Sequence, residues 1–162
     1  SITIEPGETT TSQQHNWILF RYAEILLNYA EAMVNAYGDP DYTGSYSLSA
    51  RDAVNQVRNR GDVKMPAYPA DMSKDAFLKR LKNERRVEFA FEGQRFWDLR
   101  RWKELDDMQN IYKVKVVKQT DGTIQYTKAL HATYNIQEKM YFYPISNTEL
   151  FKNHKLVQNT GW

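Results

Sequence analysis

The strongest constraint in the sequence is a helical periodicity over residues 17–37. Polar residues recur there at alternating spacings of three and four positions: Arg21, Glu24, Asn28, Glu31 and Asn35. In an α-helix this spacing places them on one narrow stripe, and most of the remaining surface is apolar. Gly38 ends the pattern, and Pro40 prevents it from resuming. We therefore predict a helix over about 17–37 that is buried on most of its sides.

Three more helices are predicted from start and stop signals. Ser49 and Asp52 have the spacing of a capping box, which starts a helix that Gly61 ends. Ser73 starts a third helix, and Gly93 separates it from a fourth that runs from Gln94 to about residue 105. These segments predict two antiparallel helix pairs, over about 17–60 and 73–105. Two pairs are fewer than a solenoid usually needs for stability, so we expect neighbouring structure outside the chain.

The last third of the chain has β character. Residues 112–117 and 123–127 alternate between apolar and polar side chains around Asp121-Gly122, which predicts a hairpin. Residues 140–145 are expected to be extended, and Asn147 is expected to cap one short helical turn. The predicted fold is mainly α, with tetratricopeptide-like antiparallel helix pairs, a small β-hairpin and an irregular C-terminal segment. We expect a single domain over 1–162: an extended lead-in (1–16), helical pairs (17–105), then the hairpin and tail (106–162).

Composition excludes several classes of function. The 22 Lys and Arg against 20 Asp and Glu give a net charge of +2, too small to bind nucleic acid by bulk electrostatics. The chain has no cysteine, which excludes disulfides, thiolate catalysis and iron–sulfur clusters. His15, His131 and His154 lack the spacing of metal ligands, so no metal or cofactor is expected. Apolar runs such as 17–20 are far too short to cross a bilayer.

The densest charged block lies between residues 84 and 101. Glu84 and Glu88 are four residues apart, as a catalytic carboxylate pair could be, but they share a helix face with apolar core positions. Oppositely charged residues in this block also lie three positions apart, a spacing that favours ion pairs on a helix over a catalytic pair. We therefore predict no catalytic residue and a structural ionic network of Glu84, Arg85, Arg86, Glu88, Glu92, Arg95, Asp98 and Arg101.

The loop over residues 39–44 resembles the first half of an EF-hand calcium loop. Asp39, Asp41 and Thr43 would supply oxygens at alternate positions before Gly44, but Ala50 stands where a bidentate glutamate is required. A hydrated loop built on Asx turns explains the same residues. Calcium binding at this loop is left open by the sequence.

The aromatic residues divide into two groups. Those at core-like helical spacing are expected to pack: Trp17, Phe20, Tyr22, Tyr29, Phe77, Phe89, Phe91, Phe96, Trp97 and Trp102. Five tyrosines fall in loops or in the hairpin, where exposed rings could stack on a sugar: Tyr42, Tyr46, Tyr68, Tyr126 and Tyr134. Isolated exposed aromatics are also ordinary, so these five are candidates for ligand contact only.

Five ordered sequence blocks resemble the C-terminal region of SusD/RagB-type proteins. They are FRYAEILLNYAEA (20–32), AVNQVRNR (53–60), ERRVEFAFEGQRFWDLRRW (84–102), YPI (143–145) and LVQNTGW (156–162). The family often has Asn-Pro-Gly-Tyr where this chain has Asn159-Thr-Gly-Trp162. The resemblance covers residues 17–162 and implies a fragment of a longer protein, with a lipid-anchoring cysteine upstream of Ser1.

The resemblance also implies a function. SusD/RagB proteins are outer-membrane, cell-surface lipoproteins that capture glycans, or in some cases peptides, and deliver them to a SusC-like TonB-dependent transporter. By this resemblance the chain would bind a glycan without catalysis, would not bind nucleic acid, and would join the membrane through the upstream anchor. The alternative is a structural or protein-interaction module that docks on the transporter without contacting sugar.

Overall fold

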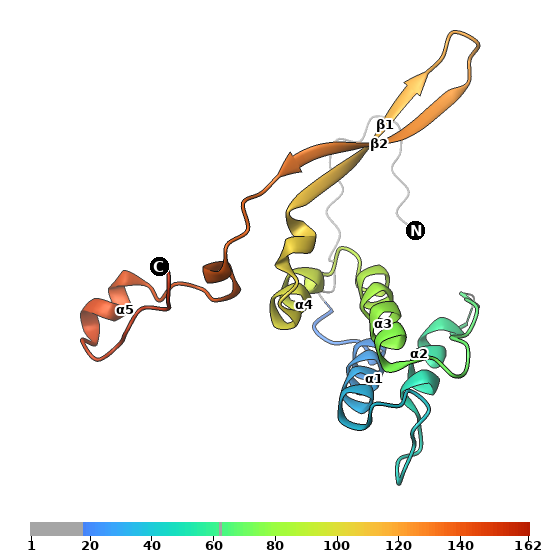
Figure 1. Ribbon diagram of the computed structural model, residues 1–162, viewed down its shortest axis with the longest axis horizontal. Helices are drawn as coiled ribbons and strands as arrows, with labels where there is room; N and C mark the ends of the chain where they lie inside the picture. Colours follow the sequence, from blue (N-terminus) through green and yellow to red (C-terminus); the bar gives the residue numbers. More distant parts are fainter. Residues whose placement is uncertain (1–17, 62) are drawn as a thin grey trace, which may run out of the picture. The chain divides into compact units, whose positions relative to one another are not determined.

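The computed structural model describes residues 18–61 and 63–162. The lead-in expected over 1–16, the helix start expected at residue 17 and the interpretation of His15 lie outside the described residues. The chain divides into two compact units, one ending at Arg85 and one spanning Arg86–Trp162. Each unit is described by itself (Figure 1). Within the described ranges, no helix combines the length and the apolarity that a bilayer crossing requires.

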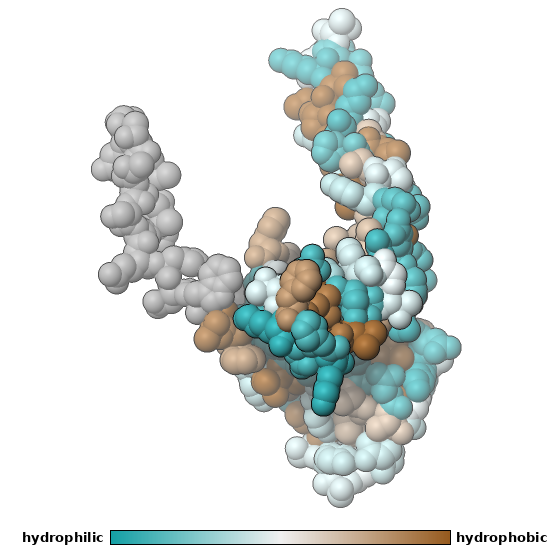
Figure 2. Space-filling view, turned by 90° about the vertical axis from the view of Figure 1, so that its left-hand side faces the viewer, coloured by the Kyte–Doolittle hydropathy of each residue, from teal (hydrophilic) through white to brown (hydrophobic). Residues whose placement is uncertain are grey.

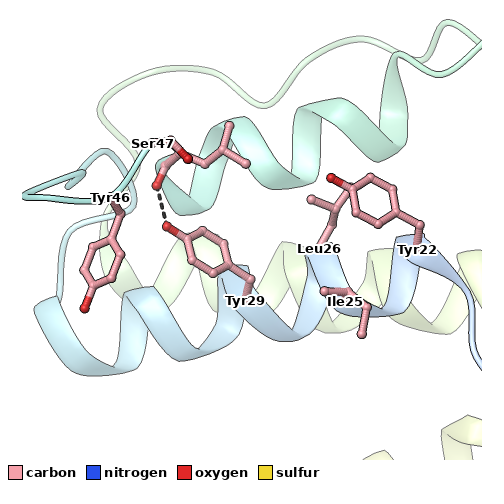
Figure 3. A pocket seen from close by; sticks show the side chains of 7 residues that line it. Tyr22, Ile25, Leu26, Tyr29, Tyr46 and Ser47 are labelled. Atoms are coloured by element: carbon pink, nitrogen blue, oxygen red, sulfur yellow. Dashed lines mark hydrogen bonds between the residues drawn. The ribbon is translucent and has the colours of Figure 1, made fainter.

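The first unit contains the predicted antiparallel pair of helices. Helix α1 spans Tyr22–Tyr37 and helix α2 spans Ala50–Arg58, with their axes running in opposite directions (Figures 1 and 3). α1 begins later than expected because Arg21 has extended backbone angles (φ −127°, ψ 149°) and forms the N-cap. Gly38 ends α1 in the left-handed conformation (φ 78°), and its N–H donates to the Val34 carbonyl at 2.9 Å.

The capping box of α2 is confirmed. The Ser49 Oγ accepts a hydrogen bond from the Asp52 N–H at 3.0 Å, and the Asp52 carboxylate accepts from the Ser49 N–H at 3.3 Å. These two bonds satisfy N–H groups that the start of a helix otherwise leaves without partners. The core between α1 and α2 consists of Leu26, Leu27, Ala30, Met33, Val34, Ala50, Ala53, Val54 and Val57.

Helix α3 spans Lys74–Glu88 and contributes Phe77 and Leu81 to the core of the first unit. The buried Arg85 guanidinium donates to the Asn28 side-chain oxygen of α1 at 2.6 Å. Asn28 belongs to the polar stripe that the sequence predicts on α1, so part of that stripe binds α3 while it stays accessible to solvent. Asn28, a polar residue on the surface of α1, therefore makes a tertiary contact.

The second unit begins with helix α4, which spans Gln94–Trp102. Gly93 precedes it at φ 78°, as the predicted break requires. α4 ends before residue 105 because Lys103 adopts the left-handed conformation (φ 58°), and a 3₁₀ helix, η1, follows over Leu105–Met108. The predicted second pair of helices, α3 and α4, is thus divided between the two units.

The predicted hairpin is confirmed and is longer than expected. Strand β1 spans Asn110–Lys118 and strand β2 spans Ile124–Thr133, paired antiparallel with Val116 opposite Tyr126. A register shift between Ile111 and Tyr112 marks a bulge. The surface of the hairpin carries apolar side chains beside hydrophilic ones (Figure 2).

The C-terminal tail differs from the expected extended segment. A 3₁₀ helix, η2, spans Glu138–Tyr141, so the prediction of an extended segment over 140–145 is wrong at its start. The Trp162 indole donates to the carbonyls of Lys139 (3.0 Å) and Phe142 (3.1 Å), a tertiary interaction that no local pattern indicates. Helix α5 spans Asn147–Lys152, and its cap is Ser146 rather than Asn147, with the Ser146 Oγ accepting from Thr148 N–H.

Candidate functional site

Three tyrosines meet at the end of α1 and in the loop that follows it. The Tyr37 ring stacks on Tyr42, with centroids 4.2 Å apart and planes 25° apart. The Tyr46 ring lies 6.1 Å from Tyr37, and the two hydroxyl groups share a hydrogen bond of 3.2 Å. All three rings remain partly accessible to solvent. We call Tyr37, Tyr42 and Tyr46 the tyrosine cluster.

Polar contacts fix the loop that carries Tyr42 and Tyr46. The Asp39 carboxylate accepts from the Asp41 N–H at 2.9 Å, which forms an Asx turn. Asp41 accepts a hydrogen bond from the Arg51 guanidinium on α2, and the Pro40 carbonyl accepts from the Arg51 N–H at 3.0 Å. The loop is thereby attached to α2 at two points, which orders the tyrosines before any ligand arrives.

Gly44 makes room for the Tyr42 ring. A Cβ atom on Gly44 would lie 2.5 Å from the Tyr42 hydroxyl oxygen, and the glycine φ of 53° is unfavourable for other residues. The glycine that resembles the sixth position of a calcium loop thus has a packing role in this structure. No group of three or more metal-ligating side chains occurs among the described residues.

The Tyr37 hydroxyl group stays protonated near neutral pH. The hydrogen bond with Tyr46 raises the pKa of Tyr37 above its ordinary value, and partial desolvation adds to that increase. A neutral phenol both donates and accepts hydrogen bonds. The cluster therefore combines aromatic faces with hydroxyl groups that form hydrogen bonds, which suits a neutral, hydroxyl-rich ligand such as a sugar.

A groove of about 240 Å³ lies beside the cluster (Figure 3). Its wall is mostly apolar, and the Tyr29 hydroxyl spans it by donating to the Leu48 carbonyl at 2.6 Å. Tyr46 belongs to both the cluster and the groove. The lining consists of Tyr22, Ile25, Leu26, Tyr29, Tyr46, Ser47 and Leu48.

The other three candidate tyrosines lie elsewhere. Tyr126 and Tyr134 are exposed in the second unit, on β2 and just after it. Tyr68 is only 5% exposed, so the expectation of an accessible loop ring is wrong for this residue. Its ring contacts Phe77 at 5.8 Å and lies under the Arg58 guanidinium at 5.0 Å. Burial, with the nearby Glu84 charge, raises the pKa of Tyr68 and keeps its hydroxyl neutral.

The charged block from residue 84 makes contacts beyond its own helix. Glu84 accepts hydrogen bonds from Arg58 on α2 and from the Tyr68 hydroxyl, the latter at 3.5 Å. In the second unit, Arg95 pairs with Asp107 at 3.0 Å. The buried Asp98 accepts from Arg101 at 2.9 Å, at a spacing of three residues. Arg86 and Glu92 are exposed and Glu88 is half-buried.

Several aromatic residues with core-like spacing are exposed in the structure. Phe77 and Phe89 are buried as predicted, but Phe20, Tyr22, Phe91 and Trp97 are exposed. Tyr37, the centre of the cluster, was not among the candidates. The available signal was the proximity of Tyr37 to two loop tyrosines across Gly38, because a left-handed glycine returns the chain toward the end of the helix.

Almost the whole chain matches one known protein family. A sequence profile of the SusD family matches residues 4–162. The chain belongs to the SusD family. This match confirms the resemblance drawn from the sequence and agrees with the mainly helical fold and small antiparallel sheet.

Individual SusD-like proteins are similar to this chain over part of their own length. SusD-like protein P38 of Formosa agariphila is 37% identical over 90 residues, which are 52% of this chain and 16% of that protein. SusD-like protein P2 of the same organism is 31% identical over 102 residues, 60% of this chain and 19% of that protein. A crystal structure of a SusD-like protein from Bacteroides fragilis has a TM-score of 0.77 at 31% identity. It covers 98% of this chain, which spans 28% of that protein.

Proposed function

We propose that the chain is part of a cell-surface, outer-membrane lipoprotein that captures a glycan and delivers it to a SusC-like TonB-dependent transporter. The match of residues 4–162 to the SusD family carries this proposal. The lipid anchor would lie in sequence outside this chain. The whole protein would bind its ligand without making or breaking a covalent bond.

The tyrosine cluster supports a direct role in glycan binding. Aromatic rings held by mutual stacking present flat apolar faces without a large loss of side-chain freedom on binding. The neighbouring hydroxyl groups can exchange hydrogen bonds with sugar hydroxyls. We therefore propose that Tyr42 and Tyr46 contact the glycan and that Tyr37 orients both of them.

A second feature supports binding rather than catalysis. Glu84, the carboxylate with the best claim to an acid or base role, is largely buried and paired with Arg58. An ion pair of this kind occupies the carboxylate with Arg58 and keeps it from contacting a substrate. The full-length protein should therefore release no reducing sugar from any polysaccharide that it binds.

The binding role can be tested with the full-length protein and a panel of soluble polysaccharides: amylopectin, laminarin, xylan and polygalacturonate. Affinity electrophoresis would identify a ligand, and calorimetry would then compare the double variant Tyr42→Ala/Tyr46→Ala with wild type. We expect at least a tenfold weaker affinity, because two stacking contacts are lost. Phe151→Ala, which removes an exposed aromatic ring in the second unit, is the matched control and should change nothing. Unchanged affinity in the double variant would exclude the cluster from the site.

The alternative function is docking on the transporter without sugar contact. The apolar side chains on one hairpin face favour it, because such faces are typical of protein interfaces: Tyr112, Val114, Val116, Ile124, Tyr126 and Leu130. Hairpin substitutions such as Val114→Lys would then weaken co-purification of the full-length protein with the transporter. Normal co-purification of that variant would argue against this alternative.

A further inference from the structure

Arg100 differs from two other arginines of helix α4 in what surrounds its charge. Arg95 and Arg101 each form an ion pair with a carboxylate of the second unit. The Arg100 side chain is half-buried, and within the part of the chain that the structure describes its guanidinium has aromatic rings as neighbours instead of a carboxylate. A partly desolvated cation is unfavourable without a counterion, so this position suits an anion that a ligand supplies.

Three aromatic rings lie beside the Arg100 guanidinium. Its central carbon is 4.3 Å from the ring centre of Tyr143, 5.1 Å from that of Phe96 and 6.0 Å from that of Trp97. Phe96 and Trp97 precede Arg100 by four and three residues, so the three side chains share one face of α4. Contact with aromatic rings attracts the cation but does not satisfy its N–H donors. We call Phe96, Trp97, Arg100 and Tyr143 the arginine–aromatic cluster.

Hydrogen bonds hold the segment that carries Tyr143. The Asn159 side-chain amide donates to the Tyr143 carbonyl at 2.6 Å. Two residues earlier, the Tyr141 hydroxyl accepts from the Leu105 N–H at 3.1 Å, which ties the segment to the 3₁₀ helix that follows α4. The Tyr143 ring is therefore positioned before any ligand arrives, which reduces the conformational entropy that binding would cost.

The exposed rings beside Arg100 indicate a sugar as the carrier of the anion. Trp97 and Tyr143 are 56% and 55% exposed, so each ring keeps accessible surface on which a sugar ring can stack. The guanidinium presents its N–H donors in a planar fork that matches a carboxylate. In a uronic acid the carboxylate is bonded directly to the sugar ring, so a single sugar residue can reach both the fork and a neighbouring aromatic ring. A neutral sugar would leave the cation without a counterion.

We propose that the arginine–aromatic cluster binds a uronic acid residue of a glycan, with Arg100 holding the carboxylate and the Trp97 and Tyr143 rings contacting the sugar. The inference rests on the proposed capture of a glycan and adds the chemical class of that glycan. It does not depend on the tyrosine cluster, because all the residues of the arginine–aromatic cluster belong to the second unit.

Calorimetry with the full-length protein and polygalacturonate tests the proposal. Carboxyl-reduced polygalacturonate, which keeps the same linkage but lacks the charge, is the matched ligand. We expect wild type to bind the reduced polymer about tenfold more weakly, and Arg100→Met to bind polygalacturonate more weakly by a similar factor, because each change removes the charge-assisted hydrogen bonds. The two changes combined should weaken binding little more than either alone, because both remove the same contact.

Lys155→Met is the control for loss of charge, because it removes an exposed positive charge from the same unit. We expect it to leave the affinity for polygalacturonate unchanged. Equal losses from Lys155→Met and Arg100→Met would mean that net charge, not the arginine–aromatic cluster, governs binding, and would overturn the proposal. So would equal affinity of wild type for the two polymers, or an equal loss on carboxyl reduction in wild type and in Arg100→Met.

The neutral polysaccharides amylopectin, laminarin and xylan separate this inference from the proposed function. Binding of one of them without binding of polygalacturonate would reject the uronic acid site and leave glycan capture intact. Binding of none of the four would reject the site and count against glycan capture as well.

Arg100→Lys is the second variant if Arg100→Met does not fold. It keeps the positive charge but loses the planar fork, so we expect weaker binding of polygalacturonate and unchanged binding of the reduced polymer. Unchanged binding of polygalacturonate by the folded Arg100→Lys protein would reject the proposed contact.

Discussion

The α1–α2 pair and the β1–β2 hairpin differ in what holds them together. The helices share a core of fully buried side chains, with Leu27, Ala30 and Val54 completely shielded from water. The hairpin has a ladder of paired residues with one bulge near its start, and neither strand has a buried side chain. An isolated two-stranded hairpin is marginally stable in water, whereas buried apolar area stabilises a helix pair directly. Substitutions should therefore affect the two regions very differently.

The largest effect is expected from the core of the first unit. Phe77→Ala removes a completely buried ring and leaves a cavity, which should lower the free energy of unfolding by about 3–5 kcal/mol. Denaturant unfolding followed by circular dichroism measures this change. Phe151→Ala, at an exposed ring, should stay within about 0.5 kcal/mol. Equal losses in the two variants would contradict the assignment of the core.

The ion pair between α2 and α3 should give the next largest effect. Glu84→Gln keeps the shape of the side chain but leaves the half-buried Arg58 without its carboxylate. We expect a loss of about 1–3 kcal/mol, because an unpaired charge remains partly desolvated. Glu149→Gln, which removes an exposed pair with Lys152, is the control and should be almost neutral. A neutral Glu84→Gln variant would show that the pair contributes nothing to the first unit.

The cap of α2 should contribute about 1 kcal/mol. Ser49→Ala removes the oxygen that accepts the Asp52 N–H at a buried position, and such substitutions typically cost about that amount. Ser146→Ala removes the corresponding bond at the start of the short, exposed helix α5 and should have less effect on global unfolding. Thermal unfolding of the two variants side by side provides the measurement. A greater loss of stability from Ser146→Ala than from Ser49→Ala would contradict the expectation that the cap in the first unit matters more.

Substitutions on the hairpin should barely change the stability of this chain. Val116→Thr keeps a β-branched side chain at an exposed position opposite Tyr126, so the expected change is within about 0.5 kcal/mol. Its solubility should increase, because an exposed apolar side chain is replaced by a polar one. A loss comparable to that of Phe77→Ala would mean that the hairpin face is buried in solution.

The smallest effect is a pH dependence of the hairpin turn. The Thr123 hydroxyl and N–H donate to the Asp121 carboxylate and lower its pKa below the ordinary value. The folded turn therefore favours the ionised form. The stabilisation from these hydrogen bonds is present above the pKa that Asp121 has in the unfolded chain. It is lost as the pH falls through the lower pKa that Asp121 has in the folded chain. An NMR titration of the Asp121 side chain measures this shift, and Thr123→Val should move the pKa back toward normal.

Much of the fold could be predicted because its signals are local. The capping box at Ser49, the left-handed Gly38 and the Asp121-Gly122 turn each act within a few residues, so their geometry follows from the sequence around them. The end of α4 at Lys103 and the 3₁₀ helix at Glu138 were missed. The second of these places carbonyls that Trp162 contacts from far along the chain.

The candidate site was only half predictable. Tyr42 and Tyr46 are loop tyrosines and were expected to be accessible, whereas Tyr37 ends a helix and was not considered. Tyr68 is also a loop tyrosine, but its ring is buried against Phe77 and Arg58. The residue types in these loops do not distinguish an exposed tyrosine from a buried one, because burial of the ring depends on which helix the loop packs against.

The sequence by itself determined the presence of the helices and the hairpin, the capping box of α2 and the family to which the chain belongs. Those features depend on the order of residues over short distances and on blocks of sequence shared with SusD-like proteins. Only the tertiary structure decided that Tyr37, Tyr42 and Tyr46 meet and that Glu84 pairs with Arg58. Contacts of this kind depend on packing between segments, which local propensity does not encode.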